Sequence, residues 1–155
     1  WFHASIAASV ASSWCTTLRW DDEEGQLQVD LTWWSLPASR WPAAIWWRVA
    51  PVVSAMGAWT MTKLGEAVGP GDVVPGGGRS LHVADELVHP EGARVDLVDS
   101  GLVSPGSPRL LVWDDAPADP SGGWHVCVLA NLWGTNFPRW SEGDGRCRVV
   151  LTLAD

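Results

Sequence analysis

The sequence contains no tyrosine and only one lysine, Lys63, beside nine arginines. It also lacks an apolar run long enough to cross a membrane, because residues 45–53 are interrupted by Arg48 and Pro51. Its first residues are mildly apolar but have no basic segment of the kind that opens a signal peptide. Since the chain begins with Trp1 rather than methionine, we expect it to be part of a longer polypeptide, and we predict no membrane partner.

Basic residues are scarce overall. The net charge is −8 and the isoelectric point is near 4.8, which argues against nucleic acid or an anionic membrane surface as a partner. The preference for Arg over Lys, together with abundant Ala, Gly and Val, is typical of a GC-rich genome. The arginines therefore do not by themselves indicate a binding site.

Cysteine is rare, and its three positions have no close spacing. No CxxC pair or Cys/His cluster is present, so we predict no metal site and no cofactor in this chain. Cys127 and Cys147 fall in two different expected strands and either form a disulfide or remain buried thiols. The second alternative is favoured, because a free buried cysteine behaves as a small apolar side chain.

No complete catalytic site is recognisable. A nucleophile elbow, a metalloprotease helix, a dinucleotide fingerprint and a phosphate-binding loop are all missing. We expect His82 and His125 to be structural, hydrogen-bonded groups, and Asp99 to serve a turn. A glycosidase needs two facing carboxylates, and nothing in the spacing pairs the candidates across a cleft. These candidates are Asp96, Asp99, Asp114 and Asp115.

Apolar and polar residues alternate in the clearest segment of the chain. Residues 26–34 place Leu, Val, Leu and Trp on one face and polar residues on the other, which predicts a half-buried antiparallel strand. Residues 43–49 are apolar on both faces, which suits a central strand. The acidic run at residues 21–24 is expected to be a solvated hairpin tip rather than a calcium site.

Short strands separated by turns predict the fold class. Further strands are expected at residues 14–20, 57–62, 80–84, 93–98, 109–113, 124–130 and 147–153. Because no amphipathic helix of convincing length is present, the sequence predicts an all-β antiparallel sandwich. We expect residues 1–155 to form a single domain, with residues 1–13 uncertain and readable as the remnant of a preceding domain.

The most distinctive segment is the loop at residues 131–140, Asn-Leu-Trp-Gly-Thr-Asn-Phe-Pro-Arg-Trp. It is longer than a strand connection requires, and it combines flat aromatic faces with amides, as sugar-binding surfaces do. The carbohydrate-contact candidates are Asn131, Trp133, Asn136 and Trp140. The alternative is a structural plug, in which the aromatic residues cover an open end of the sandwich. The plug is favoured, since aromatic side chains are mostly buried, and most of the thirteen tryptophans must lie in the core.

Three segments carry a resemblance to a known family. They are Pro-Ala-Ser-Arg-Trp-Pro-Ala-Ala-Ile-Trp at residues 37–46, Lys-Leu-Gly to Leu-His at residues 63–82, and the loop with its acidic turn at residues 131–144. Together they resemble the C-terminal region of a glycoside-hydrolase-like family, described as domain of unknown function 5054. The family is similar in layout to α-mannosidases, and the resemblance covers roughly residues 33–153. The sequence departs from it at Leu36, at Ala43-Ala44 and at Ala130, where Lys, Glu and Asn are expected.

The resemblance implies that metal and nucleophile belong to a catalytic domain upstream in the same polypeptide. This chain would then be an accessory sandwich that is inactive alone, packs on that domain and lends the loop to its carbohydrate cleft. It predicts an exposed apolar face. One alternative is a structural sandwich that mediates protein contacts, with buried indoles. The other is a free-standing carbohydrate-binding module, with coplanar exposed indoles.

Overall fold

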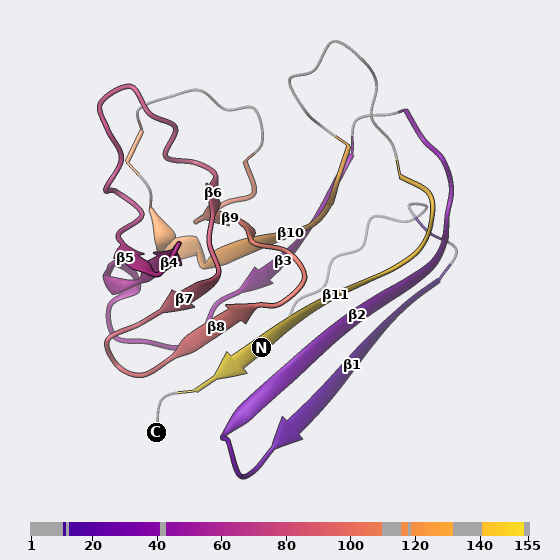
Figure 1. Ribbon diagram of the computed structural model, residues 1–155, viewed down its shortest axis with the longest axis horizontal. Helices are drawn as coiled ribbons and strands as arrows, with labels where there is room; N and C mark the ends of the chain where they lie inside the picture. Colours follow the sequence, from indigo (N-terminus) through magenta and orange to yellow (C-terminus); the bar gives the residue numbers. More distant parts are fainter. Residues whose placement is uncertain are drawn as a thin grey trace.

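The computed structural model describes residues 11, 13–40, 43–109, 116–117, 119–131 and 141–153. They form two antiparallel sheets, so the prediction of an all-β antiparallel sandwich is confirmed (Figure 1). The larger sheet has the order β1-β2-β11-β8-β7-β4-β5 and the smaller one the order β3-β10-β9-β6.

The strand bounds are as follows. The larger sheet contains β1 (Ser13–Asp21), β2 (Gln26–Leu36), β4 (Thr60–Lys63), β5 (Glu66–Val68), β7 (Glu86–Val88), β8 (Arg94–Leu97) and β11 (Gly143–Thr152). The smaller sheet contains β3 (Ala44–Val49), β6 (His82–Val83), β9 (Leu102–Pro105) and β10 (Trp124–Ala130). Two 3-10 turns, η1 (Met56–Ala58) and η2 (Pro120–Gly122), complete the described elements.

One apolar core lies between the sheets. The larger sheet contributes the alternate residues of β2 that the sequence pattern predicts, Val29, Leu31 and Trp33, all of which are buried. The smaller sheet faces them with Trp47 on β3 and Trp124 on β10. Burial of apolar side chains, of which these indoles are the largest, is the main favourable contribution to the stability of a domain of this size.

The three long strands β1, β2 and β11 lie side by side, with β1 outermost (Figure 1). β1 and β2 form a hairpin whose register runs without a shift through all nine residues of β1. The acidic segment at residues 21–24 closes this hairpin, as predicted, and Asp21 accepts the backbone N–H groups of Glu23 and Glu24. Asx-type bonds of this kind stabilise a tight turn.

The predicted strand at residues 124–130 coincides with β10. The strand predicted at 43–49 is also present, as β3, but the prediction that it is a central strand is wrong. β3 lies at an edge of the smaller sheet rather than at its centre. Its first three residues are only half-buried and Arg48 is exposed. Apolar residues on both faces of β3 therefore indicate only partial burial. They do not indicate how many strands flank it.

Several boundaries also differ from the predictions. Residues 57–58 belong to the turn η1, and β11 begins at Gly143, inside the segment that reads as a turn in the sequence. Gly145 pairs with Trp33 in this strand, and the position requires glycine because the Trp33 indole lies against its backbone, where a Cβ would overlap the ring. The short strands β5, β7 and β9 were not predicted. The predicted strand at 109–113 lies outside the described residues beyond Arg109, which is not in a strand.

Candidate functional site

Asn131 joins two connections at one end of the sandwich. Its side-chain oxygen accepts the backbone N–H of Ala43 at 2.5 Å, and its amide nitrogen donates to the carbonyl of Ser39 at 3.2 Å. Its own backbone N–H donates to the carbonyl of Ala43 at 3.0 Å. The residue that follows β10 is thus tied to the segment that precedes β3.

A bulge in β2 shapes the same end of the sandwich. Gly145 pairs with Trp33 and Gly143 with Leu36, so Trp34 and Ser35 together face a single residue of β11. Ser35 has a positive φ of 54°, and its N–H donates to the Asp144 carboxylate at 2.9 Å. The extra residue returns Leu36 to the core and leaves Trp34 40% exposed.

The structure bears on only one of the four carbohydrate-contact candidates. Trp133, Asn136 and Trp140 lie outside the described residues. Asn131 is half-buried, and its amide already bonds to Ser39 and Ala43 on both sides. In the described structure Asn131 is therefore a positioning residue at the start of the loop, and contact of these four residues with a sugar stays a prediction.

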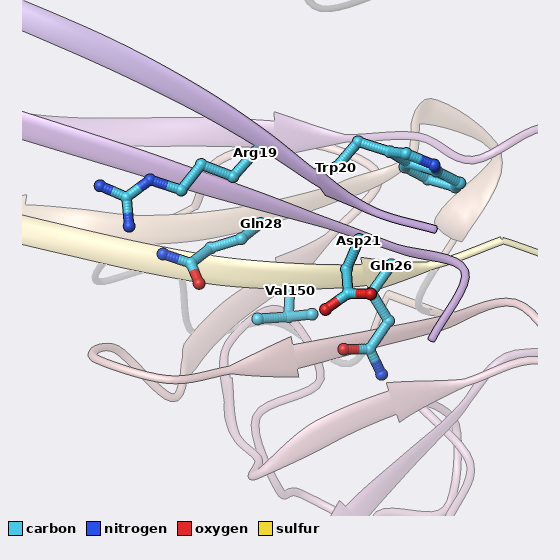
Figure 2. A pocket seen from close by; sticks show the side chains of 6 residues that line it. All are labelled: Arg19, Trp20, Asp21, Gln26, Gln28 and Val150. Atoms are coloured by element: carbon cyan, nitrogen blue, oxygen red, sulfur yellow. The ribbon is translucent and has the colours of Figure 1, made fainter. Parts of the chain in front are cut away.

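A hollow of about 300 Å³ lies at the other end of the β1–β2 hairpin. It is lined by Arg19, Trp20, Asp21, Gln26, Gln28 and Val150. Figure 2 shows the polar side chains on one side of the strands, whereas the Trp20 indole points to the other side. The Asp21 carboxylate and the Gln28 amide nitrogen are already engaged within the chain, the latter with Asp30. The remaining donors and acceptors form an open polar surface rather than a closed ligand site.

Two arginines of β11 form ion pairs on the outer face of the larger sheet. The guanidinium of Arg146 on β11 holds the buried carboxylate of Asp30 on β2, with N···O distances of 2.9 and 2.7 Å. Arg148 grips both oxygens of Asp99, each at 2.8 Å. The hydrogen bonds from the two arginines lower the pKa values of Asp30 and Asp99.

Asp99 lies in the connection between β8 and β9, where the sequence predicts a turn. Its carboxylate, however, forms an ion pair with Arg148. Sequence reasoning missed both pairs because the partners are far apart in the chain. The separation is 116 residues for Asp30 and Arg146 and 49 residues for Asp99 and Arg148. The only available signal was the alternation of Arg146 and Arg148 with the apolar residues of β11.

The two histidines singled out in the sequence, His82 and His125, are both buried but differ in how fully their rings are hydrogen-bonded. His82 is a structural residue, as predicted: its Nε2 lies 3.1 Å from the Arg79 carbonyl and its Nδ1 lies 3.2 Å from Lys63 Nζ. Burial and the neighbouring ammonium of Lys63 lower the pKa of His82, which suits a neutral ring. His125 fits the prediction in part: its ring is hydrogen-bonded to the backbone of Ser104, whereas its buried Nδ1 has no hydrogen-bond partner within the described part of the chain.

All three cysteines are free thiols, so the favoured alternative for Cys127 and Cys147 is confirmed. Both are buried, and burial raises the pKa of Cys127 to about 11 and that of Cys147 to about 12. Cys15 on β1 is exposed. The buried thiols are therefore protonated at neutral pH and are poor nucleophiles or metal ligands.

Among the described residues, no three His, Cys, Asp or Glu side chains are grouped to hold a metal ion. The same residues include no helix with the length and apolarity needed to cross a membrane. No protein-family model, no curated protein and no solved structure matches the chain.

Proposed function

We propose that this chain is an accessory, non-catalytic β-sandwich of a glycoside-hydrolase-like polypeptide. It packs on an upstream catalytic domain and contributes the Trp/Asn loop at residues 131–140 to a carbohydrate cleft. The observation that carries the proposal is the set of three hydrogen bonds that Asn131 makes to Ser39 and Ala43. They tie the start of this loop to the segment at 37–46, and both segments belong to the family resemblance.

A loop that contributes to a cleft must start from a fixed point, because an error of 1 Å in position is enough to weaken binding or catalysis. Asn131 supplies such a point through both ends of its amide. At the same end of the sandwich, the bulge at Ser35 and its hydrogen bond to Asp144 fix the end of β2 to the start of β11. Trp34, 40% exposed beside them, adds apolar surface where a neighbouring domain can pack.

The described indoles support this proposal over a free-standing carbohydrate-binding module. Trp20 pairs with Leu27 and Trp34 with Ser13, so these two exposed indoles lie at opposite ends of the hairpin. Ser13 and Trp20 are seven positions apart on β1, which at about 3.4 Å per residue corresponds to about 24 Å. Trp20 and Trp34 therefore do not form a shared stacking platform.

The first test is the sequence that precedes Trp1 in the parent gene. A long open frame with a His/Asp pattern of metal ligands is expected. A start codon immediately before Trp1 would contradict the accessory role and make binding by the isolated sandwich the question.

The second test uses the parent polypeptide and a glycosidase assay with chromogenic glycosides. Trp133→Ala and Asn131→Ala should each lower kcat/KM, whereas Asp22→Ala, at the far hairpin tip, should leave it unchanged. The thermal unfolding midpoint of each variant shows whether a lower activity comes from the changed loop or from a destabilised domain. Equal activity of all three variants would overturn the role of the loop.

A further inference from the structure

β1 differs from the other sheet edges of the described structure in length and regularity. β5 has three residues and β6 has two. The pairing of β3 with β10 is interrupted by a register shift between Cys127 and Leu129. β1 has nine residues in unbroken register with β2, and no described strand pairs with its other side.

β1 lacks most of the devices that normally protect a sheet edge, and its only charged residues, Arg19 and Asp21, lie towards one end of the strand. Its sequence, Ser-Trp-Cys-Thr-Thr-Leu-Arg-Trp-Asp, contains neither proline nor lysine, and its pairing has no bulge. Every residue except the half-buried Trp14 is exposed. The core-facing side of the strand still carries Leu18 and Trp20, which are 55% and 52% exposed. Such an edge offers backbone hydrogen bonds and apolar side chains together.

We propose that β1 is the interface for a second copy of this chain. The two β1 strands pair antiparallel about Thr17, which makes the two seven-stranded sheets one continuous sheet. A contact of this kind is isologous, and it closes at two copies because each edge is used once.

Side-chain complementarity favours the register centred on Thr17. It sets Trp14 of one copy opposite Trp20 of the other, and Thr16 opposite Leu18, on the core-facing side. Trp14 already packs on Trp33 at a ring-centroid distance of 5.5 Å, so each Trp20 would extend an existing row of indoles. Aromatic cross-strand pairs are among the most stabilising contacts between neighbouring strands.

Charge favours the same register. On the outer side, Arg19 faces Cys15 and Asp21 faces Ser13, so no like charges stand opposite one another. The two acidic tips lie at opposite ends of the interface. Because Asp21 and Ser13 are eight positions apart, the two Asp21 residues are separated by about 27 Å, beyond the Debye length of about 8 Å at physiological salt. A parallel arrangement would bring the two tips together, which the net charge of −8 disfavours.

The test measures the mass of the 155-residue chain by analytical ultracentrifugation over a concentration series. Wild type is expected to reach twice the monomer mass. Thr17→Lys and Thr17→Glu each place two like charges opposite one another, so each variant alone should stay at the monomer mass. An equimolar mixture of the two variants should recover the dimer mass as a one-to-one complex, which also shows that both variants are folded.

The matched control is Glu66→Lys, on β5 at the opposite edge of the same sheet, which should remain dimeric. A wild-type chain that stays monomeric, or that forms larger assemblies, would overturn the proposal. So would Thr17 variants that keep the dimer mass, or a mixture that stays monomeric. The interface involves neither Asn131 nor the loop, so its failure would leave the proposed function standing, and the reverse also holds.

Discussion

The carboxylate of Asp30 and the guanidinium of Arg146 join β2 to β11 on the outer face of the larger sheet, with an N···O distance of 2.7 Å. Asp30 is only 3% exposed and also accepts a hydrogen bond from the Gln28 amide at 2.8 Å. A buried carboxylate is tolerated only when charged or polar partners replace its water. The pair thus links β2, which carries the core residues Val29 and Leu31, to the neighbouring strand β11.

Arg146→Met should destabilise the domain at neutral pH. It keeps the aliphatic stem but leaves the Asp30 carboxylate with Gln28 as its remaining side-chain donor. Loss of a hydrogen bond to a charged group costs about 1.5–3 kcal/mol in the free energy of unfolding. Urea unfolding at pH 7 measures it. A variant as stable as the wild type would show that water replaces Arg146 without cost.

The pH dependence follows from the lowered pKa of Asp30. The hydrogen bond from Arg146 keeps the pKa of the folded state below 3.8, so the unfolded chain binds the proton more tightly. The stabilisation is therefore present above about pH 4 and is lost as the pH falls through the folded-state pKa. Asp30→Asn should give a flatter stability curve below about pH 4 than the wild type. An equally steep curve in Asp30→Asn would show that other carboxylates cause the loss of stability at acidic pH.

The turn between β4 and β5 predicts a stabilising substitution. Leu64 and Gly65 have φ values of 53° and 85°, and Lys63 pairs with Glu66, as in a two-residue hairpin. Leu64 is 99% exposed, so no packing of its side chain offsets the strain of the left-handed backbone conformation. Leu64→Asn should raise the free energy of unfolding by about 0.5–1 kcal/mol.

The control for this turn is Val52→Asn, at a fully exposed apolar position without a positive φ. Both substitutions remove an exposed apolar side chain, so only the backbone conformation differs between them. Urea midpoints of the two variants decide the outcome. If Asn stabilises both positions equally, the effect comes from surface polarity and the turn argument is wrong.

The fold could be read from the sequence wherever a periodic pattern extended over several residues. β2 and β10 were found because seven or more residues kept one pattern. β5 and β7 have three residues each, too few to show a period, and Leu64-Gly65 lacks the Asn-Gly signal of a hairpin. The edge position of β3 was missed because hydrophobicity reports burial and not the number of neighbouring strands.

The site was less predictable than the fold. Asn131 was selected as a sugar contact from its place in an aromatic loop, but its bonds reach residues 88 and 92 positions away. Local pattern carries no information on such partners. The same holds for Asp30, which reads as a polar, solvent-facing position of β2 and is buried because Arg146 covers it.

The three thiols should differ sharply in reactivity. Cys15 is exposed, whereas burial raises the pKa of Cys127 to about 11 and that of Cys147 to about 12. Titration with a chromogenic disulfide at about pH 8 should therefore release one equivalent rapidly and two more only after unfolding. Cys15→Ser should abolish the rapid phase. A total of one thiol after unfolding would reveal a disulfide and contradict the free thiols.

The raised thiol pKa values also set an alkaline limit. The stabilisation from the two protonated thiols is complete below the ordinary pKa of 9.0 and is lost as the pH rises towards the folded-state values. Stability should therefore decline above about pH 9. Cys147→Ala should decline less steeply, and an unchanged slope would exclude Cys147 as a source of the alkaline loss.

Substitution of Asn131 separates the two functions of its amide. Asn131→Ala removes both the acceptor for the Ala43 N–H and the donor to the Ser39 carbonyl. Leaving a partly buried donor unpaired costs about 1–3 kcal/mol in the free energy of unfolding. Asn131→Asp keeps an acceptor for Ala43 and loses only the donor, so it should cost less and serves as the matched control.

Hydrogen exchange at the Ala43 amide gives a local measurement of the same bond. This N–H should be protected in the wild type and in Asn131→Asp, and it should exchange faster in Asn131→Ala. Amides of the β3–β10 pairs, such as Val49 opposite Trp124, should keep their protection in all three proteins because their register does not depend on Asn131. Equal protection of Ala43 in Asn131→Ala would show that the connection before β3 is held by other contacts, and the loop would lose its fixed base.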